Sequence, residues 1–169
     1  MDRGLVHVYY GDGKGKTSAA VGLAVRAVGS GLSVCFAQFM KSGASGELDG
    51  LRSLGVRVVS GAQGKFSFQM NDEEKERARI GNEAVLDEAL LLADDVLVLD
   101  EAMDACRKGF LDRDRVLRLL DEKPASVEVV ITGHAPDPDF LEKADYVTEA
   151  VCCKHPYREG VPARKGIEY

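Results

Sequence analysis

The chain has 169 residues, enough for one domain with a well-packed core and too few for two domains of ordinary size. Apolar residues make up 45% of the chain and charged residues 30%, which is typical of a globular protein. The net charge of −6 indicates an acidic surface, and because basic and acidic residues are interspersed, no basic face for nucleic acid is expected.

Apolar runs of strand length alternate with helical patterns along the whole chain. In chain order we expect a strand at 5–10, a helix at 17–28, a strand at 33–39, a helix at 47–54, a strand at 56–60, a helix at 72–93, a strand at 96–100, a helix at 112–121, a strand at 127–132, a helix at 138–144 and a strand at 146–151. The strands at 96–100 and 127–132 are apolar almost throughout, which suits strands covered on both faces. The pattern predicts an α/β fold with a mostly parallel six-stranded sheet and helices on both faces, in a single domain over 1–169 with an irregular tail from about 152 to 169.

A glycine-rich segment follows the first expected strand and precedes the first expected helix. It reads Gly11, Asp12, Gly13, Lys14, Gly15, Lys16, Thr17 and Ser18. Glycines let backbone N–H groups approach an anion, and the positive end of the following helix points into the same space. Lys16 is expected to reach phosphate oxygens and the Thr17 hydroxyl to join the shell of a bound Mg²⁺. The order of strand, glycines, lysine, hydroxyl and helix predicts a P-loop that binds a nucleotide, although Tyr10 stands where the strict pattern has its first glycine.

Two loops are expected to share the rim of the sheet with this P-loop. The segments 41–46 and 61–69 are rich in glycine and small polar residues, and each follows an expected strand. In an open parallel sheet, ligands bind beyond the carboxyl ends of the strands. We therefore expect both loops to be flexible and to lie near the nucleotide.

Two acids, Asp100 and Glu101, end the apolar strand at 96–100. Downstream of a P-loop this is the Walker B arrangement, in which carboxylates hold Mg²⁺ directly or through its waters, opposite Thr17. A glutamate in this position often activates a water in nucleotide hydrolases, and the sequence leaves that second role open. A strand can also end in acids because it reaches the surface, but the upstream P-loop favours the metal site.

Three further residues are candidates for contacts with the nucleotide. His134 follows the strand at 127–132 and can donate to a phosphate or a ribose, but a solvated histidine at a loop edge fits equally well. Lys154 and His155 begin a basic tail that can bind phosphate or form a solvated surface, and both interpretations stay open. His7 lies within the first strand, where a structural role is expected.

The sequence also indicates a compartment. No apolar run reaches the roughly 20 residues of a membrane span. The first strand begins almost at Met1, which leaves no room for a signal peptide, so a cytoplasmic protein is expected. The four cysteines include no CxxC pair, and we expect them to be buried, reduced thiols.

Several of these segments together resemble a known family. They are GDGKGKTSAA after VHVYY, the run LVLDEA, the segment VVITGH, and the ending VCCKHPYREGVPARKGIEY. From the first strand to the last residue, the chain resembles the P-loop ATP:corrinoid (cob(I)alamin) adenosyltransferases. The combination of the GKGKT loop with the KH and GIEY ending makes the resemblance specific, and it implies a RecA-like fold.

The resemblance implies a reaction and its participants. Enzymes of this family transfer the 5′-deoxyadenosyl group of ATP to the cobalt of a reduced corrinoid and release triphosphate. The implied substrates are ATP and a corrinoid, which can be cobalamin, cobinamide or an a,c-diamide precursor. Mg²⁺ is the implied cofactor, with Mn²⁺ as an alternative ion. A flavoprotein electron donor and a homodimer are also implied, without a nucleic-acid or membrane partner.

The resemblance also assigns roles to residues. Residues 11–18 would bind the triphosphate, with His134, Lys154 and His155 as further nucleotide-binding candidates. The catalytic candidates are Lys16, Thr17 and Glu101, and the metal candidates are Thr17, Asp100 and Glu101. Cobalt(I) is itself the nucleophile, so the protein supplies positioning, electrostatics and a dry pocket rather than a general base.

The chain departs from the family pattern at three places. Residues 39–43 lack the tryptophan of a FIKGxW-like segment that helps to exclude the axial ligand of cobalt, and Phe39 and Phe66 are candidates to replace it. His134 stands where many members have an arginine. The N-terminal extension that covers the site in some members is missing, so corrinoid preference or site closure is expected to differ.

Two other functions stay open at this stage. A RecA-like ATPase or phosphotransferase would use Glu101 to activate water or an acceptor at the γ-phosphate. A carrier that has lost catalysis would bind corrinoid and nucleotide without turnover. The products separate the three, because adenosyl transfer yields intact triphosphate, hydrolysis yields ADP and phosphate, and a carrier yields neither.

Overall fold

The computed structural model describes residues 3–41, 45–61, 69–135 and 137–168. Part of the loop expected at 41–46 and most of that expected at 61–69 lie outside the described residues, as does Phe66. All of the expected strands and helices lie almost entirely within the described part. The expected pattern of elements can therefore be compared with the structure directly.

The centre of the fold is a six-stranded sheet in the order β3-β2-β4-β5-β1-β6. The strands are β1 (Val6–Tyr10), β2 (Val34–Gln38), β3 (Arg57–Ser60), β4 (Val96–Asp100), β5 (Glu128–Thr132) and β6 (Tyr146–Glu149). Every adjacent pair of strands runs parallel. The expected fold class is confirmed, and each observed strand lies within its predicted range.

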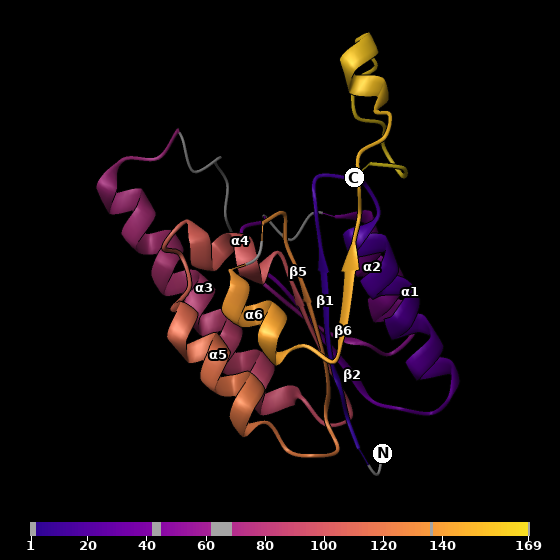
Figure 1. The fold of residues 1–169 in the computed structure, drawn as a ribbon, viewed down its shortest axis with the longest axis vertical. Coiled ribbons are helices and arrows are strands. Elements are labelled where there is room, and N and C mark those ends of the chain that lie inside the picture. The colour runs from indigo at the N-terminus through magenta and orange to yellow at the C-terminus, as the bar shows by residue number, and fades with distance from the viewer. Residues whose placement is uncertain (1–2, 42–44, 62–68, 136, 169) are drawn as a thin grey trace.

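Helices cover both faces of the sheet (Figure 1). They are α1 (Lys16–Gly29), α2 (Gly46–Ser53), α3 (Asp72–Leu92), α4 (Ala102–Arg107), α5 (Arg113–Glu122), α6 (Pro138–Lys143) and the short 3₁₀ helix η2 (Pro156–Glu159). Helices α1 and α2 lie on one face, and α3 to α6 on the other. Within the described part of the chain, no helix is both long and apolar enough to cross a membrane.

The sequence missed two of these elements. Helix α4 begins directly after Glu101 and has only 6 residues, too few to show a helical period. Helix η2 lies in the tail that was expected to be irregular, where Pro156 takes its first position. For the five other helices, each predicted end lies within one residue of the observed end. Differences of this size are common because helix ends fray.

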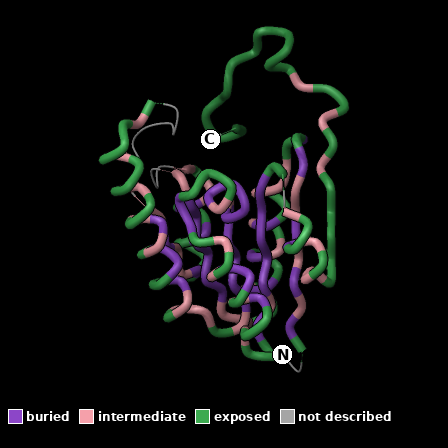
Figure 2. Tube along the Cα trace, turned by 60° about the vertical axis from the view of Figure 1, so that its left-hand side comes forward, coloured by how far each residue is buried: buried purple, intermediate pink, exposed green. Residues whose placement is uncertain are grey.

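The sheet separates two apolar core clusters, because side chains on a strand alternate between its faces. On β4, Leu97 and Leu99 pack into the cluster with α3 to α6, while Val96 and Val98 pack into the cluster with α1 and α2. Figure 2 shows the buried positions concentrated in the sheet and the inner sides of the helices, with the tail exposed. The continuous apolar runs of the central strands therefore reflect burial on both faces.

The prediction that all four cysteines are buried was wrong. Cys35 is buried, and burial raises the pKa of its thiol to about 11. Cys106 and Cys152 are half-buried, however, and Cys153 is exposed. All four are free thiols.

His7 has the structural role that its place in β1 suggests. Its Nε2 lies 2.5 Å from Glu128 Oε1 on β5, and its ring stacks on Tyr146 of β6 with 4.6 Å between ring centroids. Tyr9 Oη lies 3.3 Å from the other ring nitrogen, Nδ1. These contacts join the three strands at one edge of the sheet.

Two leucines on α3 test how far this packing stabilises the fold. Leu86 is 0% exposed and Leu91 is 85% exposed. Replacing Leu86 by alanine is expected to lower the free energy of unfolding by about 2–5 kcal/mol, because it removes buried methyl groups and leaves a cavity. Leu91→Ala, the matched control, should change that free energy by less than about 0.5 kcal/mol. Urea denaturation measures both, and equal effects would contradict the packing described here.

Candidate functional site

The carboxyl ends of the strands meet around a cavity of about 760 Å³. Residues 12–18 line it, together with Glu101 after β4, His134 after β5 and His155 in the tail. Three predicted site residues do not line it: Gly11 and Asp100, which are both buried, and Lys154, which is exposed in the tail. The structure thus brings most of the predicted residues to one place.

The P-loop backbone is fixed by the chain on either side of it. Gly11 has φ 115°, a left-handed conformation, and its N–H donates to the His134 carbonyl at 2.9 Å. The Gly13 N–H donates to the Ala150 carbonyl at 2.8 Å. A Cβ on Gly11 would lie 2.3 Å from that carbonyl oxygen, and a Cβ on Gly13 would lie 2.8 Å from it. Glycine is therefore required at both positions by the close approach of the segment after β6.

The side chains of the loop are held in different ways. Lys16 Nζ donates to the Gly13 carbonyl at 2.8 Å, so its ammonium lies over the loop. Asp12 Oδ1 accepts from the Cys152 N–H at 3.0 Å, a second contact with the segment after β6. Ser18 is exposed in the first turn of α1, a turn that carries no acidic residue. This end of α1 therefore keeps its positive field for an anion.

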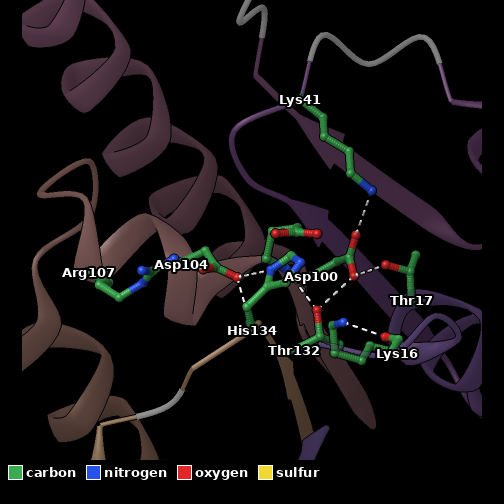
Figure 3. Close-up of polar contacts among 10 residues, drawn as sticks. Lys16, Thr17, Lys41, Asp100, Asp104, Arg107, Thr132 and His134 are labelled. Atoms are coloured by element: carbon green, nitrogen blue, oxygen red, sulfur yellow. Dashed lines mark hydrogen bonds and ion pairs between the residues drawn. The ribbon is translucent and has the colours of Figure 1, made fainter. Parts of the chain in front are cut away.

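Asp100 is the buried centre of the site, with a side chain that is 0% exposed. Its Oδ1 accepts from Thr17 Oγ1 and from Thr132 Oγ1, both at 2.8 Å. Its Oδ2 accepts from Gln38 Nε2 at 3.2 Å. It also accepts from Lys41 Nζ at 3.3 Å, as Figure 3 shows. The hydroxyl hydrogen of Thr17 thus points to Asp100, and the lone pairs of its oxygen are left for a cation.

Glu101 starts α4 in a left-handed conformation, with φ 64°. Its N–H donates to Thr132 Oγ1 at 2.9 Å, which fixes this turn at the end of β4. Burial raises the pKa of the Glu101 carboxyl, the charge of Asp100 raises it further, and Lys41 opposes both. A cation bound beside Glu101 would relieve this repulsion between two carboxylates.

The donor groups in the cavity fit Mg²⁺, which prefers oxygen ligands. Thr17 and Glu101 supply such oxygens, and Glu47 of α2, which also lines the cavity, supplies another carboxylate. Burial opposes the charge of Glu47, but hydrogen bonds from Ser45, its own amide and Gln38 outweigh burial, so its pKa lies below the usual value. Glu47 therefore offers an ionised oxygen to the cavity. Asp100 fits a supporting role, because both of its oxygens already accept hydrogen bonds.

A second group of potential ligands is better explained without a metal. Ligand atoms of Glu101, Asp104 and His134 lie within 4.8 Å of one another. Asp104 Oδ1 accepts from Arg107 at 2.7 Å, however, and its Oδ2 accepts from the N–H of His134 at 2.7 Å and pairs with His134 Nδ1 at 2.9 Å. Burial opposes the charge on Asp104, but these hydrogen bonds outweigh it and hold its pKa below the usual value. Asp104 thus fixes the orientation of His134 at the rim.

The tail returns to the P-loop. Lys14 Nζ donates to Glu168 Oε1 at 2.9 Å and to the Ile167 carbonyl at 3.1 Å. Hydrogen bonds from Arg164 and Lys14 hold the pKa of Glu168 far below its usual range. Figure 2 shows the tail leaving the sheet and curving back toward it. The tail therefore forms part of the cavity wall, and in this arrangement it neutralises Lys14.

The two basic candidates in the tail differ. His155 lines the cavity, and its Nδ1 accepts from the Tyr157 N–H at 3.2 Å, which leaves Nε2 as its remaining polar atom. Lys154 is 81% exposed and pairs with Glu159 at 3.3 Å.

Phe39, a candidate to replace the missing tryptophan, is 0% exposed in the core and does not line the cavity.

Sequence reasoning missed four residues of the site: Gln38, Lys41, Glu47 and Asp104. A signal existed for two of them. Asp104 follows Glu101 by three residues, the spacing of one helical turn, and Lys41 follows directly on the end of β2. Gln38 and Glu47 carried no local signal, because their roles depend on contacts with Asp100 and with each other across the fold.

Comparison with known proteins agrees with this site. The model of the family "ATP:corrinoid adenosyltransferase BtuR/CobO/CobP" matches residues 2–169. A corrinoid adenosyltransferase of Pseudomonas aeruginosa is 38% identical over 99% of this chain and 85% of its own length. Those of Escherichia coli K12 and Salmonella typhimurium are 37% and 35% identical, again over 99% of this chain and 87% of their own lengths.

A solved structure supports the fold alone. The cytoplasmic domain of EssC superposes with a TM-score of 0.56 at 15% identity. The match covers 98% of this chain and 37% of that one. The fold, the P-loop cavity and the full-length family match lead to one conclusion, which confirms the resemblance seen in the sequence: the chain belongs to the ATP:corrinoid adenosyltransferase BtuR/CobO/CobP family.

Proposed function

We propose that this protein transfers the 5′-deoxyadenosyl group of ATP to the cobalt(I) of a reduced corrinoid and releases intact triphosphate. The observation that carries the proposal is the P-loop cavity, in which the buried Asp100 orients Thr17 and which Glu101 also lines. Membership of the family supports the reaction class.

The loop and α1 supply the electrostatic part of the mechanism. The departing triphosphate gains negative charge as the carbon–cobalt bond forms, and preorganised donors stabilise that charge best. The P-loop residues 12–18, which include Lys16 and the N-terminus of α1, line the space where the triphosphate would lie. Because cobalt is the nucleophile, no side chain is needed as a general base.

Thr17, Glu101 and Glu47 are the residues that would hold Mg²⁺ or Mn²⁺, with Asp100 acting through Thr17. The ion, when bound, adds positive charge at the phosphates. The protein's own contribution is to fix Thr17 and Glu101 in the wall of the same cavity. The fixed turn at Glu101 serves this purpose.

The remaining partners follow from the family. Cobalamin, cobinamide or an a,c-diamide precursor would serve as the corrinoid, and a flavoprotein as the electron donor. We propose a cytoplasmic homodimer. His134, His155 and Lys154 are proposed to contact the nucleotide, and of these three only His134 and His155 line the cavity.

The reaction can be tested by its products. Under anaerobic conditions, ATP, Mg²⁺ and chemically reduced cob(I)alamin are expected to yield a light-sensitive adenosylated corrinoid and triphosphate in equal amounts. Corrinoid spectra and chromatography of the phosphates measure both products. ADP with an unchanged corrinoid would support an ATPase using Glu101 instead, and binding of both ligands without any product would support a carrier.

Lys16 is the first site residue to test. Lys16→Ala is expected to lower kcat/KM for ATP by about 100-fold or more, because it removes a cation from a charged leaving group. The unfolding midpoint should stay close to that of the wild type, because the ammonium of Lys16 donates to a carbonyl of the loop itself, Gly13. Lys75→Ala, an exposed lysine of α3, is the control and should retain full activity. Full turnover by Lys16→Ala would contradict the site assignment.

Thr17 tests the metal assignment. Thr17→Val keeps the shape of the side chain but removes the oxygen that faces the cavity, so the Mg²⁺ concentration for half-maximal activity is expected to rise about tenfold or more. Thr148→Val on the exposed β6 is the matched control. A Mg²⁺ titration of initial rates measures the effect, and identical curves for both variants would place the ion elsewhere.

A further inference from the structure

Two non-glycine residues of the described chain have a left-handed backbone, and both follow neighbouring strands at the cavity. Glu101 follows β4, and Met40, with φ 55°, follows β2. Such a conformation costs an ordinary residue about 1–3 kcal/mol and persists only where the surroundings hold it. The turn at Glu101 belongs to the site already described, whereas the turn at Met40 has no role in it.

A buried amide on α3 holds the turn at Met40. Asn82 is 4% exposed, and its Oδ1 accepts from the Met40 N–H at 3.0 Å. Its Nδ2 donates to the Ala78 carbonyl at 2.7 Å, so the orientation of the amide is fixed. Asn82 lies on the same face of α3 as the core residues Leu86 and Ala89. Burying a polar side chain on this face has a desolvation cost, which the hydrogen bonds to Met40 and Ala78 offset.

The turn brings Lys41 back over the end of the sheet. Lys41 Nζ lies 3.3 Å from Asp100 Oδ2 and 3.9 Å from Glu47 Oε1, and Lys41 lines the same cavity as the P-loop. Figure 3 shows its side chain pointing to Asp100, on the same side as Thr17. An ammonium group has three N–H donors. Within the described part of the chain, Lys41 uses one of them in a hydrogen bond, that to Asp100.

The other two lysines that line the cavity already have partners within the protein. Lys14 is neutralised by Glu168, and Lys16 donates to the Gly13 carbonyl. Lys41 reaches the cavity from the segment after β2, outside the P-loop, and its ammonium lies near the carboxylates of Asp100 and Glu47. A triphosphate in this cavity would therefore have Lys41 as a cation from outside the loop, in addition to Lys16 within it.

From these contacts we propose that Lys41 is a further phosphate-binding cation of the site, and that Asn82 is a positioning residue that acts through the left-handed turn at Met40. This inference rests on the proposed function in that the phosphate belongs to ATP. It goes beyond that function by assigning a binding residue and its support outside the P-loop. The competing explanation is that Lys41 only neutralises the buried Asp100.

Binding of inorganic tripolyphosphate separates the two explanations. Calorimetric titrations with tripolyphosphate, ATP and adenosine, each with Mg²⁺, would compare the wild type with Lys41→Met, Lys41→Arg and Asn82→Ala. Lys41→Met is expected to weaken binding of tripolyphosphate and ATP by about 10- to 100-fold, the range for a lost hydrogen bond to a charged group. Adenosine binding should not change. Lys41→Arg keeps a cation and should lose less affinity.

A rescue experiment tests whether Asn82 acts through the turn at Met40. Asn82→Ala is expected to weaken tripolyphosphate binding about fivefold through one lost neutral hydrogen bond. Adding Met40→Gly should restore part of that loss, because glycine adopts a positive φ without strain. Combining Asn82→Ala with Lys41→Met should bind no more weakly than Lys41→Met alone. Lys75→Met on the same helix is the control, and Lys41→Met and Met40→Gly test the proposal even where Asn82→Ala unfolds.

The outcomes are distinct. Tripolyphosphate affinity of Lys41→Met within twofold of the wild type would overturn the proposal, as would equal losses for adenosine and tripolyphosphate. Additive losses for Asn82 and Lys41 would overturn the positioning role. The proposed function fails separately, if the wild-type protein forms no adenosylated corrinoid, and these phosphate-binding results do not depend on that assay.

Discussion

One buried carboxylate, that of Asp100, joins the parts of the protein on which the site depends. Taking a charge out of water costs several kcal/mol unless hydrogen bonds and counter-charges replace the water. Here hydroxyls from Thr17 and Thr132, the amide of Gln38 and the ammonium of Lys41 all reach it. Satisfying this charge therefore fixes α1, β2 and β5 relative to β4. The same contacts orient the groups that face the cavity.

The parallel sheet makes this convergence possible. Every strand ends at the same rim, so residues from distant parts of the sequence meet there. The segment after β6 takes part through Ala150, whose carbonyl binds the Gly13 N–H and leaves no room for a side chain there. The P-loop is thus shaped from outside as well as by its own glycines.

His134 illustrates how a neighbouring helix supports a residue of the cavity rim. Asp104 holds it at the rim through both the backbone N–H and the ring. Gly133 permits this approach, since a Cβ there would lie 2.7 Å from Met103 Cβ. Helix α4, which carries Asp104 and Met103, is therefore part of the support of the site.

The sequence by itself determined all six strands, five of the helices, the parallel arrangement of the sheet and the glycine-rich loop, because each of these depends on local patterns such as apolar runs and glycine spacing. Only the tertiary structure decided which side chains meet. The roles of Gln38, Glu47 and Asn82 depend on contacts made in the folded protein. The residues next to them in the sequence do not indicate these contacts. The exposure of Cys153 and the burial of Phe39 were likewise decided by packing. The physical reason is that hydrogen-bond partners of a buried charge are chosen by distance in space, which a linear pattern does not contain.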